Sequence, residues 1–137
     1  MTVSASSEDT LSIVQQGFQA VAAKDVDGVI ALLADDVEWV SPDPTGRLSW
    51  GGAWRGRDEV ARWMRLVADA LDDFSLVPRQ FIVEEDTVVV LGRERARVAA
   101  TGRPYETDFA HVVRVKGGRI VSFRGFHDTA AVLAAAA

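Results

Sequence analysis

The chain has 137 residues, of which 48% are hydrophobic and 26% charged, with a net charge of −5 and no cysteine. These values are typical of one globular domain, and the acidic balance disfavours nucleic acid as a partner, because phosphates need a basic surface. The lack of cysteine excludes disulfides, thiolate metal sites and cysteine nucleophiles. No apolar run approaches the ~20 residues of a membrane-spanning helix, and the polar N-terminus does not have a signal-peptide pattern. We therefore expect a cytoplasmic protein that does not bind membranes.

Apolar residues recur at helical spacing near the start of the chain, which predicts an amphipathic helix over residues 8–23. Gly17 inside this helix costs about 1 kcal/mol relative to alanine. A second short helix is predicted after Asp25, and a short strand over 37–40. The prolines and glycines of 41–52 then predict a loop.

From Gly56 a third helix is predicted, and after it the periodicity changes from helical to alternating. Four strand-like segments follow, joined by short connections that favour antiparallel neighbours. They are 74–84, 87–100, 105–115 and 119–126. Helices followed by such a sheet indicate an α+β fold in one domain, 1–137, with frayed ends at 1–7 and 134–137. A curved sheet closed by helices would enclose an apolar pocket.

Three segments carry a resemblance to a known family. They read ADDVEWVSPDPTG at 34–46, GAWRGRDEVARWM at 52–64 and VRVKGGRIVSFRGFHDTAAV at 113–132. With the order of elements, they resemble the nuclear-transport-factor-2-like superfamily in its SnoaL-like and ketosteroid-isomerase-like branch. The resemblance implies a cone-shaped, curved antiparallel sheet packed against three N-terminal helices around an apolar pocket, a cystatin-like arrangement. It implies no single activity, because such folds include isomerases, cyclases, hydrolases and non-catalytic domains.

Asp128 follows the last predicted strand, in the sequence FRGFHDT. A carboxylate beside apolar neighbours such as Phe126 can take a proton from a carbon acid or from water. The resemblance supports this role, because SnoaL-like cyclases and limonene-type epoxide hydrolases have an acid–base aspartate at a similar position. The alternative is that Asp128 caps a short helix over 129–134.

Glu94 shares a strand face with small and apolar residues, whereas Arg93, Arg95 and Arg97 form a row on the opposite face. An unpaired buried charge is costly, so this acid needs a function or a partner. Its position is similar to that of a carboxylate in limonene-type epoxide hydrolases. That family has an arginine where this chain has Gly92, so the Asp-Arg-Asp triad of the hydrolases is broken. The alternative is a salt bridge to an arginine on a neighbouring strand.

His111 shares a predicted strand face with Phe109 and two valines. Its position resembles that of the protonated aspartic acid in the oxyanion hole of ketosteroid isomerases. A histidine there would donate a hydrogen bond to an enolate or shuttle a proton near neutral pH. The alternative is a satisfied core histidine. His127 alternates away from Asp128 and is equally compatible with the surface or a dimer face.

Asp43 lies in the segment PDPTG, which resembles the segment that carries the general base of ketosteroid isomerases. The spacing is two residues longer here, so that Ser41 occupies the ungapped register. The alternative is a local turn stabilised by the Asp43 side chain. Phe18 is the aromatic residue nearest to the isomerases' tyrosine in the first helix, and Tyr105 is predicted at a turn. The full isomerase triad is therefore absent.

Large aromatic side chains supply area for an apolar ligand or for the core. Those expected to contact a substrate are Trp39, Trp54, Trp63, Phe109 and Phe126. The tryptophan-rich loop over 41–54 is long enough to act as a lid. Two histidines make no recognisable metal site, and nucleotide-binding and Ser-His-Asp motifs are absent, so we expect no metal and no cofactor.

The leading hypothesis is a cofactor-free isomerase or cyclase for a small apolar carbonyl compound of terpenoid, steroid or polyketide type. Asp128 or Asp43 would remove a proton, and His111 would stabilise the oxyanion. The first alternative is a limonene-type epoxide hydrolase using Asp128 and Glu94, which requires both in one pocket with a basic group such as Arg124. The second is a non-catalytic ligand-binding or dimerisation module. The resemblance also implies a homodimer formed through the convex face of the sheet.

Overall fold

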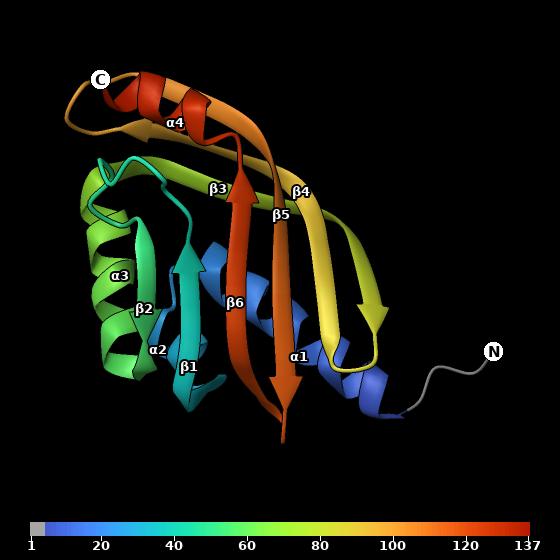
Figure 1. The fold of residues 1–137 in the computed structure, drawn as a ribbon. Coiled ribbons are helices and arrows are strands. Elements are labelled where there is room, and N and C mark those ends of the chain that lie inside the picture. The colour runs from blue at the N-terminus through green and yellow to red at the C-terminus, as the bar shows by residue number, and fades with distance from the viewer. Residues whose placement is uncertain (1–4) are drawn as a thin grey trace.

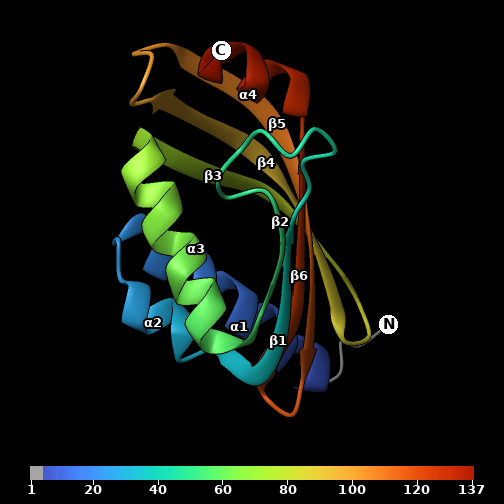
Figure 2. The same cartoon turned by 60° about the vertical axis from the view of Figure 1, so that its left-hand side comes forward.

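The computed structural model describes the backbone of residues 5–137 and the side chains from Ser7 onward. Helices α1 (Ala5–Ala22), α2 (Val26–Ile30) and α3 (Gly56–Ala70) lie on one side of a single curved sheet (Figures 1 and 2). Of residues 1–7, which were expected to fray, 5–7 belong to α1 and 1–4 lie outside the described residues. The predicted α+β fold with a curved sheet and three N-terminal helices is confirmed.

Six strands form the sheet in the order β2-β1-β6-β5-β4-β3. They are β1 (Leu33–Ser41), β2 (Gly52–Arg55), β3 (Leu71–Glu84), β4 (Thr87–Val98), β5 (Pro104–Lys116) and β6 (Arg119–His127). All neighbours are antiparallel except β1 and β6, which are parallel. The four predicted segments of the second half are confirmed as strands. The short strand β2 was not predicted, because its four residues follow directly on the loop.

Strict alternation in β4 and β5 builds the concave face of the sheet. Every second residue of β4 from Val88 to Val98 is buried, and so is every second residue of β5 from Tyr105 to Val115. Gly92 pairs with Phe109, and Phe109 pairs with His127, so these inward residues form rows across three strands. Glu94 and His111 therefore lie on the concave face, each with the apolar residues of its strand with which the sequence alternation grouped it.

The last helix, α4 (Thr129–Ala136), lies across one end of the sheet (Figure 1). It is longer than the predicted 129–134 because Val132 and Ala135 are buried against β4 and β5. Its last turn is held by side chains of the β4–β5 connection, with Thr101 Oγ1 donating to the Ala135 carbonyl at 2.6 Å. Most of the tail expected to fray therefore belongs to a docked helix. Within residues 5–137, no helix is long and apolar enough to cross a membrane.

Candidate functional site

A cavity of about 410 Å³ lies between the concave face of the sheet and the helices. Its walls are mainly aliphatic and aromatic. The polar side chains on its sheet side are Ser41 of β1 and, from β4, β5 and β6, Glu94, Tyr105, His111 and His127. The charged residues Lys24, Asp25 and Asp73 are solvent-exposed, so they belong to the mouth. A largely apolar cavity with a few grouped polar side chains is the usual form of a small-molecule site.

Glu94 is the centre of the polar group, and its residue is only 5% exposed. Its Oε2 accepts a hydrogen bond of 2.6 Å from the Tyr105 hydroxyl, and its Oε1 lies 3.1 Å from His127 Nδ1. Burial alone raises the pKa of Glu94, but the hydrogen bonds from His127 and Tyr105 outweigh it and hold the pKa below its ordinary value. Glu94 is therefore an ionised carboxylate in spite of its burial.

The ionised carboxylate fixes the hydrogen atoms of its two partners. A carboxylate has no hydrogen to give, so His127 must carry its hydrogen on Nδ1 and donate it to Oε1. In the neutral ring, Nε2 is then left as a proton acceptor. Burial and the charge of Glu94 raise the pKa of Tyr105, so this phenol stays protonated and remains a donor. Both oxygens of Glu94 are occupied, which makes it an orienting group for His127.

The arginine row of β4 does not neutralise Glu94. Arg93 points to the other face of the sheet, where it pairs with Glu106 at 3.3 Å and with Asp108 at 3.2 Å. Among the described residues, the hydrogen bonds and the ion pair of the Glu94 side chain are to Tyr105 and His127. The alternative of a salt bridge to an arginine on a neighbouring strand is therefore wrong.

His111 lies deeper in the cavity wall and is 8% exposed. Its ring packs against Phe18, Phe109 and Phe123, with centroid distances of 5.8, 4.3 and 4.7 Å. Burial lowers the pKa of His111 to about 4, against a smaller opposing effect of the Glu94 charge. The ring is thus neutral at pH 7. Among the described residues, none forms a hydrogen bond to it, so its N–H is free for a ligand in the cavity.

Asp128 is the N-cap of α4 and does not line the cavity. Its carboxylate accepts a hydrogen bond of 3.2 Å from the Ala131 backbone, and its own backbone N–H donates to Thr107 Oγ1 at 3.0 Å. Thr107 lies directly opposite Glu94 on the next strand. The Asp128 side chain thus has the geometry of the helix-capping alternative, and its backbone anchors the chain immediately after His127.

Asp43 lies in the loop between β1 and β2 and does not line the cavity. Its carboxylate accepts hydrogen bonds from the Thr45 hydroxyl at 2.6 Å, the Thr45 backbone at 2.9 Å and the Leu48 backbone at 2.8 Å. These hydrogen bonds, from the Thr45 hydroxyl first, lower the pKa of Asp43. The side chain therefore stabilises the turn, as the local-turn alternative describes.

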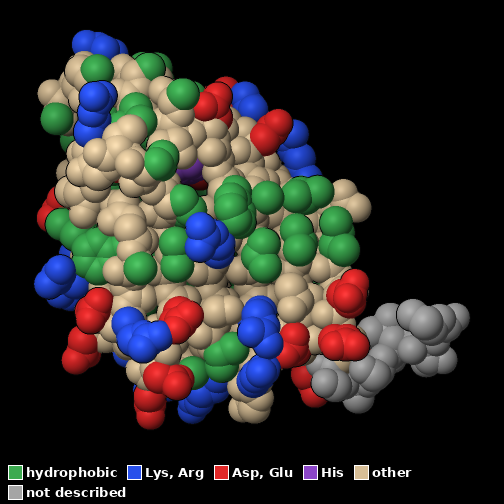
Figure 3. All heavy atoms as spheres, in the orientation of Figure 1, with side chains coloured by type: hydrophobic (Ala, Val, Ile, Leu, Met, Phe, Trp, Pro, Cys, Tyr) green, Lys and Arg blue, Asp and Glu red, His purple; other side chains and the backbone are tan. Residues whose placement is uncertain are grey.

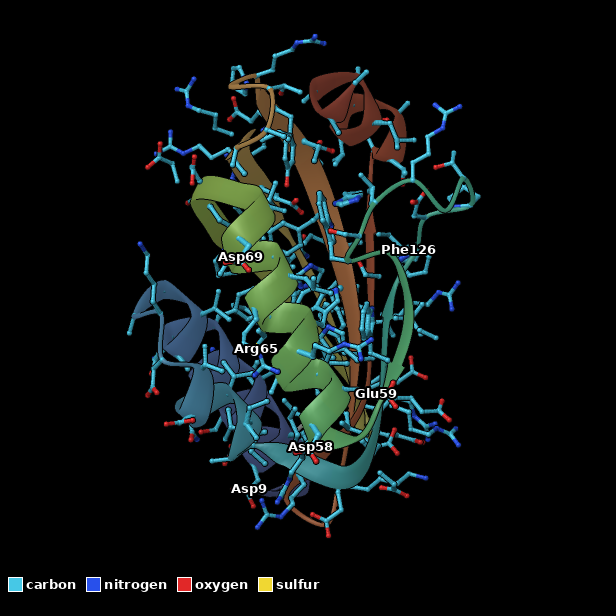
Figure 4. The ribbon with its side chains drawn as sticks, turned by 90° about the vertical axis from the view of Figure 1, so that its left-hand side faces the viewer. Asp9, Asp58, Glu59, Arg65, Asp69 and Phe126 are labelled. Atoms are coloured by element: carbon cyan, nitrogen blue, oxygen red, sulfur yellow. The ribbon has the colours of Figure 1, made fainter. Side chains whose placement is uncertain are left out.

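Of the five aromatic residues expected to contact a substrate, Trp39 and Trp63 line the cavity, whereas Phe126 alternates to the convex face beside Ala110 and touches the cavity only at its rim. Phe126 is at the rim, 45% exposed, near the loop that follows β1 (Figure 4). The other two, Trp54 and Phe109, are buried in the core.

The loop that was expected to be a lid is fixed by one carbonyl. Trp50 O accepts hydrogen bonds from two indoles, at 2.8 Å from Trp63 and 3.2 Å from Trp54. Trp50 itself is buried and lines the cavity. The loop is thus tied at one end to α3 and β2 and at the other to the turn around Asp43.

Among the polar residues of the cavity that were considered from the sequence, His127 had the weakest support. It lies on the concave face because Phe123, Gly125 and His127 alternate inward, in register with Phe109. Counting the register across β5 and β6 would have paired it with the inward-facing Phe109. No group of three metal-ligating side chains occurs within residues 5–137.

A sequence profile of the SnoaL-like domain matches residues 14–123, which is most of the chain. The chain belongs to the SnoaL-like domain family. No curated protein matches it.

Solved structures place this SnoaL-like domain among the NTF2-like folds. An NTF2-like protein of unknown function from Burkholderia pseudomallei K96243 is 34% identical, with a TM-score of 0.87 over 93% of this chain and 96% of that chain. TerC, co-crystallised with polyporic acid, is 25% identical, with a TM-score of 0.85 over 93% and 97%. A Catenulispora acidiphila DSM 44928 protein with a ketosteroid isomerase-like fold, in complex with trimethylamine, is 18% identical, with a TM-score of 0.76 over 90% of each chain. The predicted superfamily and branch are confirmed.

The burial of His111 predicts that acid destabilises this SnoaL-like domain. An unfolded histidine titrates near pH 6.5, and His111 in the fold titrates at about 4. Between these values the unfolded chain binds more protons, so the free energy of unfolding falls as the pH is lowered through this range. The loss between pH 7 and pH 5 should be about 2 kcal/mol, and His111→Gln should remove it. Urea unfolding at both pH values measures the difference.

An NMR titration of the wild-type His111 ring gives a reading that does not depend on the variant. A midpoint near its unfolded value, or an unchanged pH dependence in His111→Gln, would contradict the burial argument. Glu94 has a lowered pKa and ionises below the window used.

Proposed function

We propose that the protein binds a small, mostly apolar carbonyl compound and transfers a proton on it without a cofactor, as an isomerase or cyclase. One observation carries the proposal. A buried carboxylate orients His127 so that Nε2 is free, and His127 lines the same apolar cavity as a neutral, unpartnered His111. A base and a hydrogen-bond donor in one dry site are what enolisation of a carbonyl compound needs.

The first step assigns one role to each group. His127 Nε2 takes a proton from the carbon next to the substrate carbonyl, and the electron pair of the broken C–H bond moves to form an enolate. Glu94 stabilises the imidazolium that forms, because its carboxylate already accepts the Nδ1–H. The His111 N–H donates a hydrogen bond to the enolate oxygen. Tyr105 keeps Glu94 in place.

The second step decides between the two reaction types. In an isomerisation, the substrate has a C=C bond next to the deprotonated carbon, so the enolate is a dienolate, and protonated His127 returns the proton to its far carbon. In a cyclisation, the enolate carbon attacks a second carbonyl of the same molecule, and His127 gives its proton to the new alkoxide. Either way His127 ends neutral, and no external acid, base or oxidant is consumed.

The bases expected from the sequence become weaker candidates in this proposal. Asp128 and Asp43 both hold local turns by hydrogen bonds and do not line the cavity. His127 takes the role of the base. The expected role of His111 as oxyanion donor is retained.

Epoxide hydrolysis receives little support from the geometry. Arg124, the basic group that it would need, is exposed, and its guanidinium lies over the Phe126 ring at 5.4 Å. A Cβ at Gly92 would come within 2.3 Å of the Val77 carbonyl and 2.6 Å of Phe109, so the hydrolases' arginine cannot stand there. The capping role of Asp128 instead favours non-catalytic ligand binding as the second candidate function.

Hydrogen–deuterium exchange on a simple ring ketone tests proton abstraction without knowledge of the natural substrate. NMR would follow loss of the α-proton signals of β-tetralone in D₂O. We expect the wild type to accelerate exchange, and His127→Gln to reduce the acceleration by roughly 100-fold, the usual size of a general-base contribution. Asp128→Asn is the matched variant, because asparagine also caps helices well while it cannot act as the base. It should keep most of the activity, as should Asp43→Asn.

Two results would contradict this assignment in different ways. Loss of exchange in Asp128→Asn with normal exchange in His127→Gln would make Asp128 the base. Binding of the ketone with no acceleration by the wild type would favour the non-catalytic candidate.

We also propose that two copies pair through the convex face of the sheet. Figure 3 shows apolar side chains gathered across the sheet face that the helices leave open. Val89 pairs with Val112 and Leu91 with Ala110, all half-buried, and Phe126 lies beside Ala110. A contiguous apolar patch of this kind on a folded domain usually marks an interface.

Light scattering coupled to size-exclusion chromatography should give a dimer mass for the wild type at micromolar concentration. Val112→Lys places a second positive charge directly opposite Arg124 in the middle of the patch and should shift the protein to a monomer, because an unpaired charge at an interface is costly. Gln16→Glu, on the exposed side of α1, serves as the control and should remain dimeric. A monomeric wild type would contradict the pairing.

A further inference from the structure

Gly17 stands in the interior of α1, where glycine is a poor helix former. It has no unusual backbone conformation, since it does not belong to the glycines with positive φ. Close packing does not require it either, because a Cβ built there would meet only Leu32 Cδ1, at the ordinary distance of 3.9 Å. Neither the backbone nor the core therefore explains why this position has no side chain.

Gly17 does, however, line the cavity. The neighbouring wall residues of α1 are apolar, and the α3 residues that face the cavity, from Trp63 to Ala68, carry no charge. The charged residues Arg65 and Asp69 of α3 are turned away from the sheet (Figure 4). Apart from the mouth, the helix side of the cavity is thus apolar, and the polar side chains are on the sheet side.

The contrast between the apolar helix side and the polar sheet side indicates which kind of ligand fits the cavity. A molecule in the cavity meets hydrogen-bonding groups on its sheet side, at Ser41, His111 and His127 and at the Trp39 indole N–H, which is buried and has no partner among the described residues, and it meets hydrocarbon on its helix side. The part of the ligand that faces Glu94 should not be anionic, because a second anion beside this buried carboxylate would be repelled. The class that fits is a polycyclic compound that carries its oxygen atoms on the sheet side and no negative charge beside Glu94.

We propose that Gly17 is a specificity-determining residue: the space left by its missing side chain is filled by the apolar body of that ligand. The inference rests on the proposed ligand-binding function and adds to it the size of the ligand. Any side chain at this position would reduce the space on the helix side of the cavity. The glycine therefore lowers the stability of α1 and leaves room for a larger ligand.

A graded pair of variants and a graded set of probes test this. Gly17→Ala and Gly17→Leu add one and four carbon atoms to the wall, and Ala22→Leu adds side-chain volume at an exposed position of the same helix. The probes are phenol, β-naphthol and a hydroxyphenanthrene, which have one, two and three fused rings and one hydroxyl each. Isothermal titration calorimetry measures their affinities, and thermal unfolding measures stability.

We expect Gly17→Ala to raise the melting temperature, because alanine is the better helix former and finds no clash. Gly17→Leu should weaken hydroxyphenanthrene binding by about tenfold or more, the usual cost of overfilling a packed site. It should leave phenol binding unchanged. Ala22→Leu should bind all three probes like the wild type.

Each contrary result has a separate meaning. If Gly17→Ala is less stable than the wild type, the backbone or the core requires the glycine and the proposal is wrong. If hydroxyphenanthrene binds equally well to a folded Gly17→Leu, the ligand body does not reach α1 and the proposal is also wrong. If the wild type binds none of the three probes, the proposed ligand-binding function is wrong, and the inference about Gly17 is then wrong as well.

Discussion

The carboxylate of Glu94 is a buried charge on an otherwise apolar face, and the polar half of the cavity is organised by the need to satisfy it. Tyr105 and His127 each donate to one of its oxygens. Tyr105 in turn belongs to the core cluster that includes Val132 of α4 and Trp50 of the β1–β2 loop. A change at Glu94 would therefore affect α4 and the loop as well as the site. This arrangement follows from the cost of leaving a buried ion without partners.

The same carboxylate makes two histidines chemically different. His127 is held by a charged partner, whereas His111 is surrounded by aromatic rings and is kept neutral by burial. Environments that separate neighbouring titratable groups in this way are typical of acid–base sites. The helices contribute shape only, and the glycine in α1 belongs to that contribution. In the proposed function, one side of the cavity supplies the acid–base groups and the other selects the ligand by size.

Most of the fold could be predicted because its periodicity is regular, and alternation in β4 and β5 alone placed Glu94 and His111 on the inner face. The site was harder to predict. Aspartate stabilises turns and helix starts with the same side chain that serves catalysis, so sequence cannot separate these roles at Asp43 and Asp128. His127 was hard to predict because it alternates away from Asp128, the expected base, and only pairing across strands fixes which side chains of β6 point inward.

The most direct test is to determine which of the two His127 ring nitrogens carries a hydrogen, by ¹⁵N NMR on the wild-type protein at slightly alkaline pH. We predict a hydrogen on Nδ1, donated to Glu94, and an Nε2 that carries no hydrogen and is open to the cavity. A ring with its hydrogen on Nε2 would contradict it, because Nδ1 would then have no hydrogen to donate to an ionised carboxylate and His127 would have no free nitrogen with which to take a proton.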